Sequence, residues 1–238
     1  MAEPAEVPAA VRAGRGIVYI VTGKAHTEAA RRSALSARAT NPGLGIALFS
    51  DRPSDDPVFD RLLRIDDPHI RSKVDCLPRT PFAETLYLDS DTRVLGPLDD
   101  LFDVLGRFDL AIAQRSRVRA GRKSVRWRFD VPAAFPEHNG GVILYRSSAA
   151  AIGFLEAWRD AYAEADFKVD QITLRELLWS SDLRFAVLPQ RYNCRRHGWF
   201  EHLFSRRAGP VILHTNRFHP TRYGTLRRRL AWVEGPGR

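Results

Sequence analysis

Residues Leu86 to Phe102 read LYLDSDTRVLGPLDDLF, and the middle of this stretch carries the main chemical signal of the chain. An apolar run that predicts a buried strand ends directly in Asp89-Ser90-Asp91. In an extended backbone, side chains two residues apart point the same way, so both carboxylates face one direction. Two such like charges are unfavourable unless a cation lies between them, and oxygen ligands in this arrangement suit Mg²⁺ or Mn²⁺. The alternative is a simple turn after the strand, where Asp and Ser are both favoured.

Short apolar runs alternate with segments of helical periodicity along the rest of the chain. The sequence predicts strands at 16–21, 44–50, 62–65, 84–88, 109–113, 142–145, 185–188 and 211–213, and helices at 24–40, 147–163 and about 170–178. The strands are continuously apolar, which is typical of strands buried on both faces. We therefore expect an α/β fold with a mixed, mostly parallel sheet flanked by helices.

In such sheets, ligands bind beyond the carboxyl ends of the strands. The polar residues that follow predicted strands are Thr22-Gly23, Asp89-Ser90-Asp91 and His214, and Asn139-Gly140-Gly141 comes just before one. We expect these residues to gather at one edge of the sheet.

The composition is that of a globular protein, with 44% hydrophobic and 27% charged residues among 238. We expect one domain over residues 16–238, a flexible leader over 1–15 and a basic tail from about 217. The net charge of +9 favours anionic partners and is compatible with weak contact with a membrane surface. Two cysteines form no metal or disulfide pattern, and no signal peptide or membrane-spanning run is apparent, so a cytoplasmic location is expected.

Several segments resemble, in order, those of a known enzyme group. The stretch from Thr80 to Asp103, TPFAETLYLDSDTRVLGPLDDLFD, resembles the DXD region of nucleotide-sugar glycosyltransferases with the GT-A (Rossmann-like) fold. The closest likeness is to the family 8, or glycogenin-like, group and its bacterial relatives. Further matching segments are FPEHNGGVILYR, VDQITLRELL, VLPQRYNCR and VILHTN. The resemblance spans about residues 17–216, and the ordered set is more specific than any one segment.

The resemblance implies metal-dependent transfer of a sugar from a nucleoside diphosphate donor, expected to be a UDP-sugar, with retention of configuration. It implies that Asp89, Asp91 and His214 bind the metal, and an imidazole ligand favours Mn²⁺ over Mg²⁺. Asp170, Gln171 and Asp91 are implied as catalytic residues. The implied donor-binding residues are Val21, Thr22, Gly23, Lys73, Ser90, Asn139, Gly140 and Gly141. The acceptor is not indicated.

Each of these residues also has a simpler interpretation. His214 could be an ordinary histidine, and Thr22-Gly23 a plain strand exit. Lys73 could be solvated, with Arg71 in its role. The glycine pair could form a turn, and Asp170 could cap a helix.

The stretch from Arg115 to Arg128, RSRVRAGRKSVRWR, carries seven basic residues and no acidic one. We expect a loop that contacts substrate, which favours an acidic acceptor, although the charge could simply be solvated. Glu137 and His138 nearby are titratable residues without an assigned role.

Two other functions are weighed against a glycosyltransferase. A sugar-1-phosphate nucleotidyltransferase would carry a Gly- and Arg-rich loop after the first strand, and VTGKAH lacks it. A non-enzymatic basic protein would bind nucleic acid in a salt-sensitive way, but we do not expect nucleic acid to be the main ligand. The histidines lack zinc-site spacing, and the P-loop glycines are missing.

Overall fold

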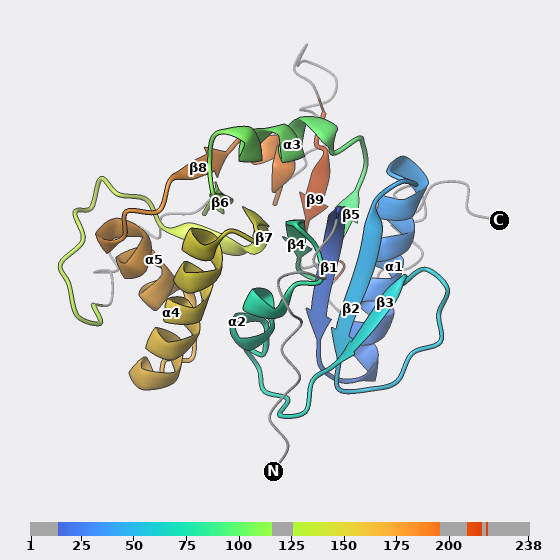
Figure 1. Ribbon diagram of the computed structural model, residues 1–238, viewed down its shortest axis with the longest axis horizontal. Helices are drawn as coiled ribbons and strands as arrows, with labels where there is room; N and C mark the ends of the chain where they lie inside the picture. Colours follow the sequence, from blue (N-terminus) through green and yellow to red (C-terminus); the bar gives the residue numbers. More distant parts are fainter. Residues whose placement is uncertain (1–13, 116–125, 196–208, 216–217, 219–238) are drawn as a thin grey trace.

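The computed structural model describes residues 14–115, 126–195, 209–215 and 218 (Figure 1). The predicted leader and most of the predicted basic tail lie outside these residues. A central sheet has the strand order β3-β2-β1-β4-β7-β6-β8, and a small second sheet pairs β5 with β9. The strands are β1 Arg15–Val21, β2 Gly45–Ser50, β3 Arg61–Arg64, β4 Glu84–Leu88, β5 Thr92–Val94, β6 Leu110–Gln114, β7 His138–Arg146, β8 Phe185–Leu188 and β9 Ile212–His214.

Helices cover both faces of the central sheet (Figure 1). They are α1 Lys24–Thr40, α2 Lys73–Cys76, α3 Asp99–Asp103, α4 Ala149–Ala165 and α5 Gln171–Ser180, with short 3₁₀ turns at Leu77–Arg79, Val104–Gly106 and Gln190–Tyr192. Along β1, Ile17 and Tyr19 pack into the core under α1 and α3, while Val18 and Ile20 pack into the core under α2, α4 and α5. Burial on both faces explains why the strand sequences are continuously apolar.

The sheet is mixed and mostly parallel, as predicted. Strands β1, β2, β3 and β4 run parallel to one another, β6 runs parallel to β8, and β7 is antiparallel to both of its neighbours. Because β7 runs in reverse, its amino end lies at the edge where β1, β2 and β4 end. The backbone N–H of Asp89, just after β4, donates to the carbonyl of Gly141 in β7 at 2.9 Å.

The main error of the sequence prediction concerns residues 138–141. They belong to β7, which begins at His138 and not at Val142, so the glycine pair is not a turn before the strand. The sequence analysis also missed β5, α2 and α3. Among the described helices, none is long and apolar enough to cross a membrane.

Candidate functional site

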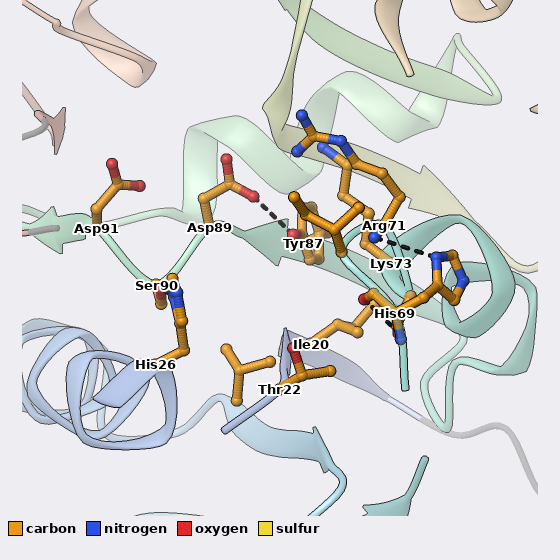
Figure 2. A pocket seen from close by; sticks show the side chains of 13 residues that line it. Ile20, Thr22, His26, His69, Arg71, Lys73, Tyr87, Asp89, Ser90 and Asp91 are labelled. Carbon is orange, nitrogen blue, oxygen red and sulfur yellow. Dashed lines mark hydrogen bonds between the residues drawn. The ribbon is translucent and has the colours of Figure 1, made fainter. Parts of the chain in front are cut away.

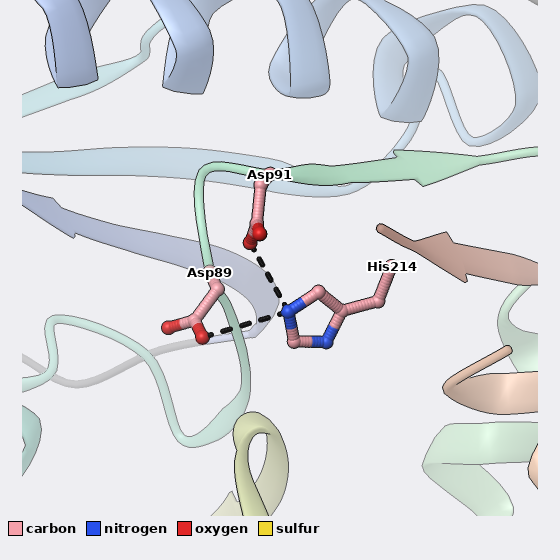
Figure 3. A group of neighbouring side chains, drawn as sticks. All are labelled: Asp89, Asp91 and His214. Carbon is pink, nitrogen blue, oxygen red and sulfur yellow. Dashed lines mark ion pairs between the residues drawn. The ribbon is translucent and has the colours of Figure 1, made fainter. Parts of the chain in front are cut away.

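Asp89, Asp91 and His214 converge just beyond the end of β4 (Figure 3). The imidazole Nε2 lies 3.1 Å from Oδ1 of Asp91 and 3.8 Å from Oδ2 of Asp89. His214 is the last residue of β9. It pairs with Thr92 of β5, and Thr92 directly follows Asp91. Two carboxylates and one imidazole form a donor set that fits a divalent cation, and the nitrogen ligand suits Mn²⁺. The residues predicted to bind metal therefore do lie together.

Neighbouring side chains hold this cluster in place. The Tyr87 hydroxyl donates to Oδ1 of Asp89 at 2.6 Å. Burial, together with the nearby Asp89 carboxylate, raises the pKa of Tyr87 well above its ordinary value, so the phenol keeps its proton. On the other side, Asn193 and Arg195 contact the two ring nitrogens of His214. Sequence analysis missed the roles of these three residues, although Tyr87, Asn193 and Arg195 all lie in segments that carry the family resemblance.

Gly141 and Gly140 leave room for side chains of the site. A Cβ on Gly141 would lie 2.4 Å from Cε1 of His214 and 2.5 Å from Oδ2 of Asp89. A Cβ on Gly140 would lie 3.1 Å from Nζ of Lys73. The two glycines thus let the β7 backbone approach both halves of the site, and contact with a donor sugar stays a prediction. Asn139 is buried, and its Oδ1 accepts from the Gly141 N–H at 2.9 Å.

Lys73 and Asp170 form a buried ion pair beside these glycines. Nζ of Lys73 lies 2.8 Å from Oδ2 of Asp170 and donates to the Gly140 carbonyl at 3.0 Å. Burial alone would raise the pKa of Asp170, but the charges of Lys73 and Arg71 outweigh it and lower the pKa below its ordinary value. The interpretation of Lys73 as a solvated residue is therefore wrong. Asp170 makes no side-chain cap of α5, so the helix-cap interpretation is wrong as well.

A pocket of about 540 Å³ opens next to the carboxylates (Figure 2). Its walls include Val21 and Thr22 from the end of β1, Arg71 and Lys73 from the segment before β4, and Asp89-Ser90-Asp91. The sequence left open whether Arg71 or Lys73 lies at the site, and in the structure both line the pocket.

Two further predicted residues, Gly23 and Gln171, are not among those that line this pocket. Gly23 has a φ of 80°, and its N–H donates to Oδ1 of Asp51 at 2.8 Å. Gln171 is the first residue of α5 and is partly buried. His26, which sequence analysis did not single out, lines the pocket with Nδ1 3.4 Å from Oγ of Ser90.

The basic stretch from Arg115 to Arg128 is described only at its ends, since residues 116–125 lie outside the described residues. The described arginines pair with acids: Arg115 with Glu137, Arg126 with Asp130 and Arg128 with Glu164. The buried Glu176 accepts hydrogen bonds from the backbone N–H groups of residues 127, 128 and 129. These contacts anchor the end of the stretch, and contact with substrate stays a prediction.

His138 is a buried residue that packs against Phe135 and Phe185. Neither ring nitrogen has a hydrogen-bond partner within the described part of the chain. Burial and the nearby charge of Arg175 lower the pKa of His138 from 6.5 to about 4. The residue is therefore neutral in the folded protein at pH 7, and its surroundings are those of a core residue.

Gly141→Ala is expected to weaken Mn²⁺ binding by about 10-fold or more, because the new methyl group would displace His214 or Asp89. The measurement is Mn²⁺ titration followed by electron paramagnetic resonance. Gly153→Ala is the control, since a Cβ at this position in α4 meets nothing within 4 Å. Unchanged Mn²⁺ affinity in Gly141→Ala would contradict the site geometry.

Stability should fall as the pH drops from about 6.5 to about 4, because the unfolded chain then takes up a proton at His138 that the folded protein does not. Because the pKa of His138 is lower in the folded than in the unfolded protein, its titration should lower the free energy of unfolding by about 3 kcal/mol between these two pH values. Urea denaturation at several pH values should show a weaker pH dependence for His138→Leu than for the wild type. Identical slopes for the two proteins would show that His138 is not the titrating group.

Solved glycosyltransferase structures share the fold of this chain. GlyE of Streptococcus pneumoniae TIGR4 is similar over 85% of this chain and 54% of its own, with 22% identity and a TM-score of 0.61. The galactosyltransferase LgtC, solved with donor and acceptor sugar analogs, is similar over 92% of this chain and 95% of its own, with 16% identity and a TM-score of 0.60. Mouse xyloside xylosyltransferase 1 is similar over 85% of this chain and 97% of its own, with 14% identity and a TM-score of 0.55. The chain thus spans about half the length of GlyE.

No curated protein matches the sequence. A family model described as nucleotide-diphospho-sugar transferase matches residues 83–223, more than half of the chain, and this range includes all three residues of the candidate metal cluster. The expected fold class and the family resemblance are confirmed. The chain belongs to the nucleotide-diphospho-sugar transferase family and has the GT-A fold of glycosyltransferases.

Proposed function

We propose that this chain is a metal-dependent glycosyltransferase that moves a sugar from a UDP-sugar to an acceptor with retention of configuration. The observation that carries the proposal is the cluster of Asp89, Asp91 and His214 on the wall of a pocket. Asp89 and Asp91 belong to both features, so a cation held there would face whatever occupies the pocket. A nucleoside diphosphate supplies the phosphate oxygens that complete the coordination of such a cation.

Each wall of the pocket has a role in the proposal. When bound, the metal supplies Lewis-acid stabilisation of the diphosphate leaving group. Arg71 adds positive charge on the same side, Lys73 lines the same wall in its ion pair with Asp170, and the exit of β1 at Val21 and Thr22 holds the nucleoside. Asp170 and Gln171 lie on the sugar side of the site in this proposal, where the buried Asp170 carboxylate holds Lys73 through their ion pair.

The surroundings of the candidate bases support retention. An inverting enzyme needs a group that removes the acceptor proton, and we consider the titratable residues Asp170, Glu137 and His138 for that role. Asp170 is paired with Lys73, and Glu137 is paired with Arg115. His138 is buried and has a pKa of about 4. All three are thus poorly placed to act as that base, which suits a mechanism that needs none.

Asp91→Asn is expected to lower the rate of sugar transfer by about 100-fold or more, because it removes one charged metal ligand. The measurement is release of nucleoside diphosphate from a panel of nucleotide sugars in the presence of Mn²⁺. Asp100→Asn is the control, because Asp100 is an exposed carboxylate in α3.

The same assay separates the other functions. Release of pyrophosphate from a nucleoside triphosphate and a sugar-1-phosphate would indicate a nucleotidyltransferase. If no donor in the panel reacts or binds, or if Asp91→Asn retains full activity, the proposed function is wrong.

A further inference from the structure

We propose that Asn193 is a positioning residue for the candidate metal site. It holds His214 in the tautomer with the proton on Nδ1, so that Nε2 presents its lone pair to the cation between Asp89 and Asp91. The consequence for metal binding rests on the proposed function, whereas the tautomer itself is a property of the protein alone.

The first observation concerns Nδ1 of His214. It lies 2.8 Å from Oδ1 of Asn193, and both side chains are almost fully buried. An amide oxygen can only accept a hydrogen bond, so Nδ1 must donate it. With the proton on Nε2 instead, two lone pairs would face each other at this distance in a buried place. A neutral imidazole carries one ring proton, which leaves Nε2 bare.

The second observation concerns Nε2, on the other side of the ring. Figure 3 shows this nitrogen facing the two carboxylates. Nη1 of Arg195 lies 3.1 Å from Nε2. A guanidinium group can only donate, so this contact requires a lone pair on Nε2. The Arg195 contact agrees with the tautomer that Asn193 sets, while Oδ1 of Asp91, 3.1 Å from the same nitrogen, is the neighbour that a cation would bridge. The tautomer therefore rests on the Nδ1 contact, and it is the one that can bind a metal.

Backbone pairing fixes Asn193 relative to His214. The N–H of Asn193 donates to the carbonyl of Gln190 at 3.0 Å. The next residue, Cys194, donates to Ile212 and accepts from the His214 N–H, both at 2.9 Å. The segment of Asn193 thus runs alongside β9, and the amide and the imidazole are held by the same hydrogen bonds. Orienting a ligand that is already held in this way costs little free energy when the metal binds.

Packing alone does not explain an asparagine at this position. Its Nδ2 is buried and has no hydrogen-bond partner in the part of the chain that the structure describes. A buried polar group without a partner costs about 1–3 kcal/mol, whereas a leucine of similar size would carry no such cost. The amide is explained by its oxygen, which orients His214. Because leucine has a similar size and no polar group that needs a partner, Asn193→Leu is expected to fold.

The tautomer can be measured in the metal-free protein. In ¹⁵N-histidine-labelled wild type at about pH 9, where imidazole is neutral, two-bond ¹H–¹⁵N spectra should show the His214 proton on Nδ1. The His214 signals are assigned from their loss in His214→Gln. Asn193→Leu should shift His214 towards the Nε2–H form, while Asn193→Asp, which keeps an acceptor oxygen, should preserve the Nδ1–H form. Gln190→Leu, an exposed change in the same 3₁₀ turn, should have no effect.

The wild-type spectrum can overturn the proposal by itself, since a proton on Nε2 contradicts it whether or not the leucine variant folds. An unchanged tautomer in Asn193→Leu would also overturn it.

Mn²⁺ titration followed by electron paramagnetic resonance tests the consequence. Asn193→Leu should bind Mn²⁺ about 10-fold more weakly or worse, and Gln190→Leu should match the wild type. Equal affinity of Asn193→Leu and wild type would overturn the positioning role. Failure of the wild type to bind Mn²⁺, with or without UDP, would instead count against the proposed function, and the metal-free spectra would still decide the role of Asn193.

Discussion

The pairing of β5 with β9 is the constraint on which the site depends. These strands have three residues each, yet they place His214 opposite Thr92, directly after the Asp89-Ser90-Asp91 turn. The Thr215 N–H donates to the Asp91 carbonyl at 3.2 Å, so the backbones of the two ligand segments are joined as well. His214, a candidate metal ligand far from Asp89 and Asp91 in sequence, is thus positioned by main-chain hydrogen bonds. Side-chain packing then has only to set the rotation of the imidazole ring.

The antiparallel strand β7 supplies the other half of the arrangement. Its reversed direction brings residues 139–141 to the edge where β1 and β4 end, and its two glycines make a close approach possible. On one side of the strand lie Asp89 and His214, and on the other lie Lys73 and Asp170. The same short piece of backbone therefore separates the metal-binding cluster from the buried ion pair. A side chain at either glycine would press on one of them.

The parts of the fold that were predictable from sequence are those with strong local patterns. Continuous apolar runs identified the central strands, and the family resemblance selected His214 among seven histidines. Strand β5 was missed because its sequence, Thr-Arg-Val, is not a continuous apolar run, and the start of β7 was missed because Asn and Gly are poor strand formers. The Lys73–Asp170 pair joins residues far apart in sequence, and no local signal reveals such a contact. The same holds for the contact of Asn193 with His214, which lies in β9.

Local charge, and not the net charge of +9, governs what the pocket can bind. Lys73 and Asp170 neutralise each other across 2.8 Å. Of the remaining charged groups at the site, Asp89 and Asp91 are negative, and Arg71 and Arg195 are positive, so these charges cancel when His214 is neutral. That balance offers a diphosphate no net attraction, whereas a divalent cation between the carboxylates would make the site positive. In the proposed function, a cation between the two carboxylates at the end of β4 would therefore supply the attraction for a nucleoside diphosphate, even though the protein as a whole is strongly basic.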